Sequence, residues 1–118
     1  MVLVDTSVWV SHLRHGNEDL QELLHDGEVV CHPFIVGELA CGNLKNRQEI
    51  LTYLQSLPMT ILAEDEEVLK FIVVHQMMGK GLGYIDVHLI ASALLTDIFL
   101  WTFDKTLDTF SKKIGLSY

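Results

Sequence analysis

The sequence predicts an α/β domain with a mainly parallel sheet. Two apolar segments, MVLVD at the start and IFLWTF near the end, have the length and composition of buried strands. Between them the apolar residues mostly recur at helical spacing, so strands and helices alternate along the chain. This alternation is typical of a parallel sheet, because a crossover helix must return the chain to the edge where the next strand begins. No repeat and no linker interrupts the 118 residues, so residues 1–118 are expected to form a single domain.

Residues 1–5 are expected to form the first strand, and a helix follows it directly. The hydroxyl group of Thr6 or Ser7 can accept a hydrogen bond from the helix backbone and so cap a helix that runs through Leu13. Residues 18–26 carry their leucines on one helical face, and a glycine follows them, as is typical of a helix end.

The middle of the chain predicts a strand, two helices and a second short strand. EVVCH is the strand, and Pro33 can start the next helix because the N–H group that proline lacks is not needed there. That helix is expected to stop near Gly42. Residues 46–56 repeat isoleucine and leucine at helical spacing, and a proline ends the pattern. The segment MTIL, residues 59–62, is a short strand candidate.

The last part of the chain begins with a helix over residues 64–79, whose acidic start suits a helix N-terminus. A glycine-rich loop over residues 79–83 separates it from an apolar helix. The remaining expected elements are that apolar helix over residues 85–96, a strand over 98–103, a helix over 104–113 and a final edge strand over 115–118.

Composition limits the classes to which the chain can belong. Apolar residues make up 49% of it and its mean hydropathy is +0.29. These values are high for a protein of this size and predict a surface that a partner covers, either a second copy or another protein. No apolar run approaches the roughly 20 residues that span a bilayer. The N-terminus lacks the basic start and long apolar stretch of a signal peptide, so a cytoplasmic location is expected.

The charge balance constrains any role in nucleic-acid binding. Eight Lys and Arg residues oppose 16 Asp and Glu residues, which gives a net charge of −8. A protein that binds nucleic acid only by neutralising phosphates is normally basic. To bind nucleic acid, this chain would therefore need a bound metal and a local basic rim. Each basic residue by itself is more typical of a solvated surface. Those that could form the rim are Lys45, Arg47, Lys80, Lys105, Lys112 and Lys113.

Four acidic residues stand out because each is set beside apolar sequence. Carboxylates seldom occur within buried strands or helices unless something pairs with them. A cluster of carboxylates without matching bases is suited to a hard divalent cation. The four are Asp5 in VLVDTSVW, Glu38 in FIVGELACG, Asp86 in LGYIDVHLIASAL and Asp104 in IFLWTFDKTL.

Two of these residues, Asp5 and Asp104, lie at the carboxyl ends of predicted strands. Ligands of α/β sheets bind beyond the carboxyl ends of the parallel strands, so both residues are expected at the same edge. Each of the four also has an ordinary explanation: Asp5, Asp86 and Asp104 can cap helices, and Glu38 can be a solvated helix residue. A capping aspartate can also bind a metal, and the occurrence of all four together favours a site.

At these motifs the chain resembles the PIN-domain family, and in particular the VapC-type toxins of bacterial toxin–antitoxin pairs. The resemblance rests on VLVDTSVW, VGELACG, D-x-x-L-I-A-x-A and W-T-F-D-K, which follow one another over nearly the whole chain. It implies a three-layer α/β fold with a central, mainly parallel sheet flanked by helices. It also implies an endoribonuclease that depends on Mg²⁺ or Mn²⁺, acts on RNA, and is inhibited by a small antitoxin protein. The assembly expected from it is a homodimer or a toxin–antitoxin hetero-oligomer.

The resemblance assigns roles to the four acidic residues, which would be the catalytic set. Asp5, Asp86 and Asp104 are expected to hold metal directly or through water. Glu38 is expected to orient the attacking water or to complete the metal's ligands.

Three more residues are expected near the carboxylates. Thr6 and Thr102 correspond to small hydroxyl residues of the family and would hydrogen-bond the carboxylates. Asp108 would be an outer acidic member of the site.

Other functions for an acidic α/β chain fit less well. A dehalogenase-type phosphatase needs D-x-D-x-T after its first strand, whereas here Asp5 is followed by Thr6-Ser7-Val8-Trp9, so the second acid is absent. A phospho-receiver domain needs an acidic pair near its first strand, which is also missing. A PIN-like module that binds RNA or protein without catalysis stays open, since the net charge favours it and the intact acidic set opposes it.

Overall fold

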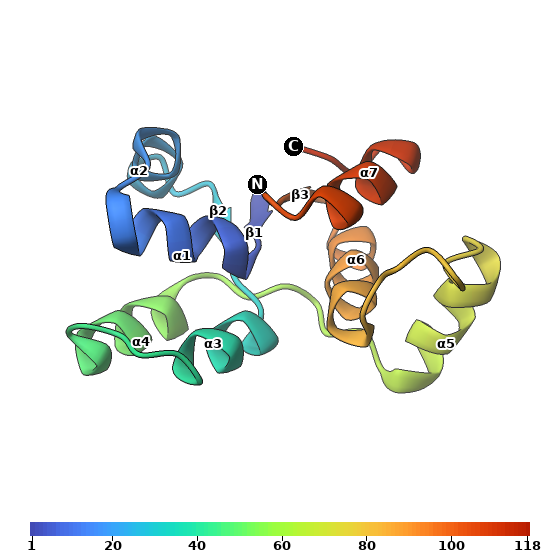
Figure 1. Ribbon diagram of the computed structural model, residues 1–118, viewed down its shortest axis with the longest axis horizontal. Helices are drawn as coiled ribbons and strands as arrows, with labels where there is room; N and C mark the ends of the chain where they lie inside the picture. Colours follow the sequence, from blue (N-terminus) through green and yellow to red (C-terminus); the bar gives the residue numbers. More distant parts are fainter.

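The sheet at the centre of the molecule has three parallel strands in the order β2-β1-β3 (Figure 1). The computed structural model describes residues 1–118. The central strand β1 (Val2–Val4) pairs on one side with β2 (Val29–Val30) and on the other with β3 (Phe99–Trp101). Leu3 lies opposite Val30 in one neighbour and Leu100 in the other. The α/β class with a parallel sheet is therefore confirmed.

Seven helices flank this sheet on both sides. In the view of Figure 1, α1, α2 and α4 lie to the left of the strands, and α5, α6 and α7 lie to the right. The helices are α1 (Thr6–His15), α2 (Glu18–His25), α3 (Pro33–Ala40), α4 (Arg47–Ser56), α5 (Asp65–Val74), α6 (Tyr84–Thr96) and α7 (Lys105–Lys113).

Two predicted strands are reduced to single bridges. Met59 bridges to Cys31, and Ser117 bridges to Leu100, both in parallel. The MTIL segment does not continue the ladder, because the backbone N–H of Ile61 donates to the hydroxyl of Thr96 at 2.9 Å instead. The prediction of strands over 59–62 and 115–118 was therefore wrong in extent, although both segments lie at the sheet edges.

Two helix ends differ from those expected. Neither Thr6 nor Ser7 caps α1, because the N-cap position belongs to Asp5, whose side chain makes no capping hydrogen bond. The helix expected to reach Gly79 ends at Val74, and Gln76 then takes a left-handed conformation with φ of 52°. A non-glycine residue in that region cannot continue a right-handed helix.

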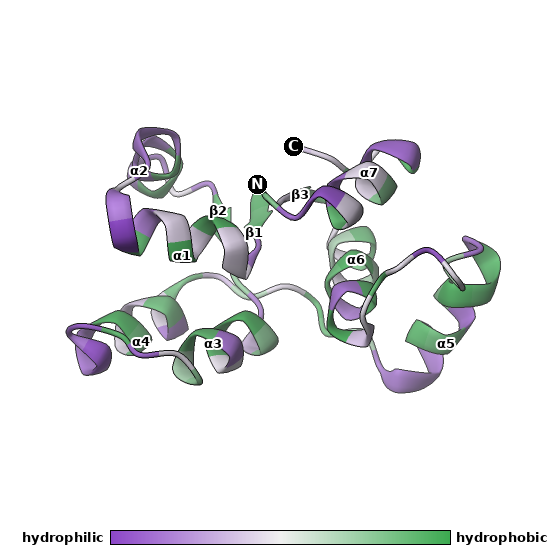
Figure 2. Cartoon of the chain, in the orientation of Figure 1, coloured by the Kyte–Doolittle hydropathy of each residue, from purple (hydrophilic) through white to green (hydrophobic).

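The core lies on both faces of the sheet. All three residues of β1 are buried, as is typical of a central parallel strand covered from two sides. In α6 the seven consecutive residues from Val87 to Ala93 are buried, and this helix packs against β3 and α5. Figure 2 shows the apolar residues along the strands and along α6. A helix that is apolar on every side is stable only in the interior, so α6 forms the centre of one helical layer.

No helix of the structure is both long enough and apolar enough to cross a membrane.

Candidate active site at the carboxyl edge of the sheet

Asp5 lies at the end of β1, where the strand passes directly into α1. Its backbone N–H donates to the carbonyl of Trp101 at 2.9 Å, so pairing with β3 continues up to this residue. Its side chain is only 7% exposed. The Oδ2 atom accepts hydrogen bonds from the hydroxyls of Thr102 at 2.7 Å and Ser7 at 2.8 Å. Two short bonds to one oxygen fix the orientation of this buried carboxylate.

Ser7 and Thr102 join the first strand to the last through their hydroxyl groups. The two oxygens lie 3.2 Å apart. The backbone N–H of Phe103 donates to Ser7 Oγ at 3.0 Å, and that of Asp104 donates to Thr102 Oγ1 at 3.0 Å. The turn that carries Asp104 is thereby tied to the residues that hold Asp5. Sequence reasoning treated Ser7 only as a helix cap, and the signal it missed was the serine two residues after the strand-ending aspartate.

Replacing Ser7 by alanine should lower the free energy of unfolding by about 1–3 kcal/mol, because the Asp5 carboxylate loses one donor and the Phe103 N–H loses its acceptor. Urea denaturation of the variant measures this. The control is Ser11→Ala, since Ser11 is a half-buried residue one turn further along α1 whose side chain makes no hydrogen bond. Equal stability of the two variants would remove Ser7 from this network.

Asp104 and Asp86 are each placed at the start of a helix. Asp104 is the N-cap of α7, and its Oδ1 accepts from the backbone N–H of Leu107 at 2.9 Å. Asp86 lies in the first turn of α6, and its Oδ2 accepts from the backbone N–H of Gly83 at 3.1 Å. Each cap uses only one carboxylate oxygen. Both aspartates can therefore cap a helix and still offer the other oxygen to a ligand.

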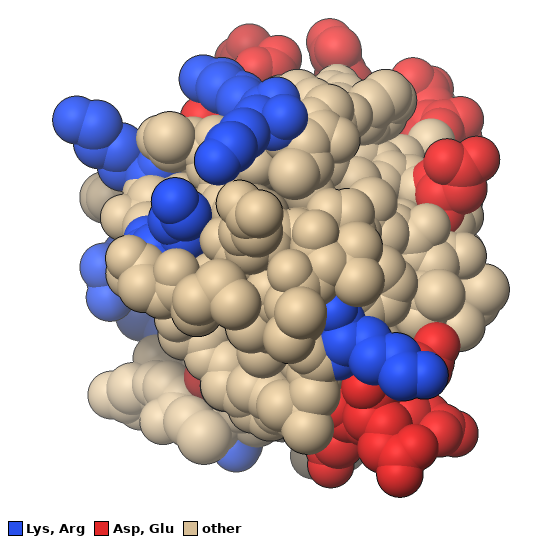
Figure 3. Space-filling model, turned by 90° about the vertical axis from the view of Figure 1, so that its right-hand side faces the viewer, with Lys and Arg blue, Asp and Glu red and all other residues tan.

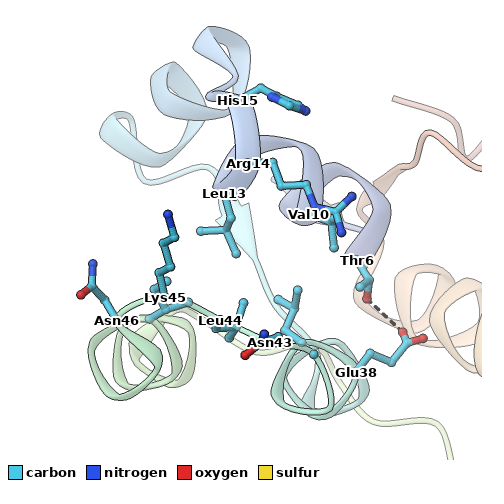
Figure 4. Close-up of a pocket in the computed structure, with 13 residues that line it drawn as sticks. Thr6, Val10, Leu13, Arg14, His15, Glu38, Asn43, Leu44, Lys45 and Asn46 are labelled. Carbon is cyan, nitrogen blue, oxygen red and sulfur yellow. Dashed lines mark hydrogen bonds between the residues drawn. The ribbon is translucent and has the colours of Figure 1, made fainter.

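Glu38 reaches the site from α3, in the other helical layer. Its Oε1 accepts a hydrogen bond from the Thr6 hydroxyl at 2.9 Å (Figure 4). This bond links the first turn of α1 to the last part of α3. Thr6 and Thr102 thus each contact a carboxylate, while their effect on catalysis stays a prediction.

Asp86 lies within electrostatic range of Asp5 and Asp104, and Glu38 lies within range of Asp5 and Asp86. The pKa of Glu38 is raised, first by desolvation and then by the charges of Asp5 and Asp86, against the lowering effect of the Thr6 hydrogen bond. The pKa of Asp86 is raised by desolvation and by the charges of Asp5 and Asp104, against its bond from Gly83. The fold therefore gathers residues from four separate elements into one acidic group, which we call the acidic quartet: Asp5, Glu38, Asp86 and Asp104.

Because the pKa of Asp86 is raised above its ordinary value of 3.8 in the folded chain, its charge destabilises the metal-free fold at neutral pH. This cost disappears as the pH falls through the raised pKa, where the carboxyl becomes neutral. We expect Asp86→Asn to raise the melting temperature of the chelator-treated protein by about 2–5 °C at pH 7, and the gain to shrink towards pH 4. The amide oxygen can still accept from Gly83. A gain that is the same at both pH values would contradict this account.

The donor chemistry of the acidic quartet fits a hard divalent cation. Each carboxylate commits one oxygen to the hydrogen bonds described above, and the other oxygen has no protein donor. Oxygen ligands of this kind are preferred by Mg²⁺ and Mn²⁺. No three Asp, Glu, His or Cys side chains converge closely enough to enclose an ion. To enclose a cation, the carboxylates would therefore have to move closer together.

Asp108 is occupied elsewhere. Its Oδ1 accepts from the hydroxyl of Ser117 at 2.8 Å, and its Oδ2 pairs with Nζ of Lys112 at 3.1 Å. These partners lower the pKa of Asp108. Oδ1 ties the C-terminal segment to α7 and Oδ2 pairs within α7, so the Asp108 side chain makes no hydrogen bond or ion pair with the acidic quartet. We therefore leave it out of the proposed site.

Known proteins resemble this chain in sequence and in fold. Residues 2–113 match the family model described as the PIN domain. Ribonuclease VapC32 of Mycobacterium tuberculosis, from strains CDC 1551 / Oshkosh and ATCC 25618 / H37Rv, is 41% identical over 118 residues, which cover 99% of this chain and 95% of that protein. The crystal structure of PAE2754 from Pyrobaculum aerophilum matches with a TM-score of 0.62 and 18% identity, covering 92% of this chain and 78% of that chain, and so shares the fold. The chain therefore belongs to the PIN-domain family.

Proposed function

We propose that this protein is a divalent-metal-dependent endoribonuclease and the toxin of a toxin–antitoxin pair. The observation that carries the proposal is the gathering of the acidic quartet beyond the carboxyl ends of β1 and β3. The likeness to Ribonuclease VapC32 supports RNA as the substrate. The reaction is phosphodiester hydrolysis: the oxygen of water bonds to phosphorus, one bridging P–O bond breaks, and the leaving oxygen takes up a proton.

The hydrogen bonds of each residue of the site indicate its role in this reaction. Asp5, Asp86 and Asp104 would hold Mg²⁺ or Mn²⁺ through the oxygens that make no protein contact. Such an ion, when bound, lowers the pKa of a coordinated water and offsets negative charge on the phosphate. Glu38 would orient the attacking water, because Thr6 fixes its Oε1 and leaves Oε2 to accept a hydrogen from that water. The hydroxyls of Ser7 and Thr102 keep Asp5 from turning away.

The net charge of −8 is compatible with RNA binding because the charges are unevenly distributed. On the face shown in Figure 3, most Lys and Arg side chains gather on one side and most carboxylates on the other. An RNA strand can approach the cationic side without passing the main acidic patches. The alternative function, a PIN-like binding module without catalysis, is favoured by the net charge and by the lack of three converged metal ligands.

Cleavage of RNA by the pure protein separates these two functions. The chain is incubated with total cellular RNA in Mg²⁺ or Mn²⁺, and fragments are resolved by gel electrophoresis. We expect cleavage with either metal, and none by a variant in which all four residues of the acidic quartet are changed to amides. Binding of RNA without cleavage under all metal conditions would support the binding module and contradict the enzyme.

The proposed antitoxin is a small protein that covers the toxin and blocks the acidic quartet. A mostly apolar hollow of about 240 Å³ lies between α1, α2 and α4, and Trp9, Leu13 and Leu24 contribute to it. Such a surface suits the apolar face of a partner helix. The acidic quartet would attract an arginine from the same partner, which could take the place of the metal.

We also propose that the protein is not a monomer. Helix α5 leaves several apolar side chains uncovered, since Leu69, Val73 and Val74 are 59%, 65% and 71% exposed. A helix face of this kind can pack against the same face of a second copy.

One co-expression experiment tests both the inhibition of the toxin by its antitoxin and the assembly of the two proteins. The chain is produced alone and with the product of the neighbouring upstream reading frame, and growth, RNA integrity and the mass of the purified species are compared. We expect the chain alone to stop growth and degrade RNA, and co-expression to restore both and yield a complex heavier than one copy of each protein. A soluble chain that leaves growth and RNA unchanged would contradict the toxin assignment.

A further inference from the structure

A groove begins at Glu38, one member of the acidic quartet, and runs along α1 to a cationic end. It has a volume of about 640 Å³ and lies between α1 and the segment that connects α3 to α4. At one end are Thr6 and Glu38, joined by their hydrogen bond. Towards the other end are Arg14 and Lys45, and Figure 4 shows Lys45 pointing from the connecting segment towards α1. Because α1 rises about 1.5 Å per residue, Arg14 lies roughly 12 Å along the helix from Thr6.

The two cations of this groove have no acidic partner. Arg14 and Lys45 take part in none of the ion pairs of the structure. Glu38 is the only carboxylate among the residues that line the groove, and it lies with Thr6. In a chain with 16 acidic and 8 basic residues, a groove that contains two unpaired cations and one acid is a local reversal of the overall charge.

The start of α4 adds to the positive character of the cationic end. Asn46, which lines the groove, is the N-cap of this ten-residue helix, has a φ of 53°, and makes no capping hydrogen bond with its side chain. The first backbone N–H groups of α4 therefore lack the acceptor that a capping side chain would supply. Free N–H groups and the helix dipole both favour an anion at this position.

We infer that this groove binds the sugar–phosphate backbone of the RNA strand on one side of the cleavage point. The inference rests on the proposed function, which supplies RNA as the ligand at the acidic quartet. Phosphates would lie against Arg14, Lys45 and the start of α4, a few nucleotides from the bond that is cut. The apolar side chains of Val10 and Leu13, which also line the groove, provide a surface for ribose or base.

An RNA strand suits the groove better than a protein segment does. A segment that inserts a cation among the carboxylates would complement the acidic end but would gain nothing from two further cations. A nucleic acid carries one negative charge per nucleotide, so it matches the cationic end while its scissile phosphate lies at the acidic quartet. The apolar hollow beside α2 is the better surface for a protein helix.

The test measures RNA binding without cleavage. The catalytically impaired Asp104→Asn protein is titrated into a fluorescent single-stranded RNA of mixed sequence and about twelve nucleotides, within the range that single-strand-binding sites cover. Arg14→Gln, Lys45→Gln and the double variant are added to this background, and binding is followed over a range of salt concentrations. Each lost phosphate contact should reduce the slope of log K against log salt by about 0.7, which corresponds to roughly fourfold weaker binding at 0.15 M salt. The double variant should bind at least about tenfold more weakly.

The matched control is Lys70→Gln, which removes one exposed cation from α5, outside the candidate basic rim. This variant should change the slope and the affinity much less than either single groove variant does. Equal losses in Lys70→Gln and in the single groove variants would show that charge acts from anywhere on the surface, and would overturn the inference. A groove pair that binds RNA normally but no longer binds the antitoxin would assign the groove to the protein partner and overturn the inference as well.

The outcome is distinguishable from failure of the proposed function. If the protein with an intact acidic quartet does not cleave RNA, the enzyme proposal fails. The slopes of log K against log salt still test whether the groove binds RNA. If cleavage occurs, the groove pair in that protein should raise KM at least about tenfold with a much smaller change in kcat, because it removes backbone binding rather than the reacting groups. Unchanged KM and unchanged binding would overturn the groove inference while the enzyme proposal stands.

Discussion

Changing Asp104 to asparagine should abolish RNA cleavage while the fold is kept. The substitution removes one negative charge from the acidic quartet and one ligand for the proposed metal. A loss of about 3 kcal/mol of transition-state stabilisation corresponds to a rate at least about a hundredfold lower. The fold should survive because asparagine is as good an N-cap as aspartate, so its side-chain oxygen can still accept from Leu107. Cleavage rates in Mg²⁺, with circular dichroism to verify folding, measure both effects.

The control for this experiment has to be chosen from the structure. Asp65, which lies in the exposed acidic run at the start of α5, is unsuitable because it accepts from the Tyr84 hydroxyl at 3.0 Å and lies 3.3 Å from Nε2 of His88. Its neighbour Glu66 is exposed and makes no side-chain contact. Glu66→Gln removes the same charge and should leave the rate within about twofold. A near-normal rate in Asp104→Asn would take Asp104 out of the catalytic set.

Divalent metal should be required for cleavage and should stabilise the fold. An ion that binds only the folded chain stabilises it by about 2.7 kcal/mol at a concentration a hundred times its dissociation constant. For a domain of this size that is a rise in melting temperature of roughly 10 °C. Mg²⁺ or Mn²⁺ should produce this rise in the protein as it stands, and excess EDTA should abolish cleavage.

Two controls separate specific binding from general salt effects. Potassium chloride at equal ionic strength should give a much smaller rise, because it screens the repulsion among the carboxylates without being held by them. The variant with all four acidic residues changed to amides should melt higher than the unmodified protein without metal and respond little to Mg²⁺. Full cleavage in excess EDTA would exclude the proposed role of metal.

The local pattern of the sequence was sufficient to predict the secondary structure and its class. Helix and strand positions follow from apolar spacing and from proline and glycine at the ends, which are properties of short segments. The alternation of strands and helices predicted a parallel sheet, and with it that Asp5 and Asp104 share an edge. The hydrogen bonds through Thr102 join them there. The predictions failed where a long-range contact competed with a local pattern, as when Thr96 takes the N–H of Ile61 and ends a strand.

The sequence by itself therefore determined the α/β class, the family motifs and the residue types of the acidic quartet. Only the tertiary structure decided which side chains meet. Glu38 and Asp86 approach Asp5 because α3 packs against α1, and α6 packs against β3, which pairs with β1. These contacts bring together segments far apart in the chain. The same packing assigns Ser7 to Asp5, takes Asp108 away to the C-terminal segment, and forms the groove that ends at Arg14. A carboxylate's neighbours in space set its charge and its freedom to bind, and local sequence does not specify those neighbours.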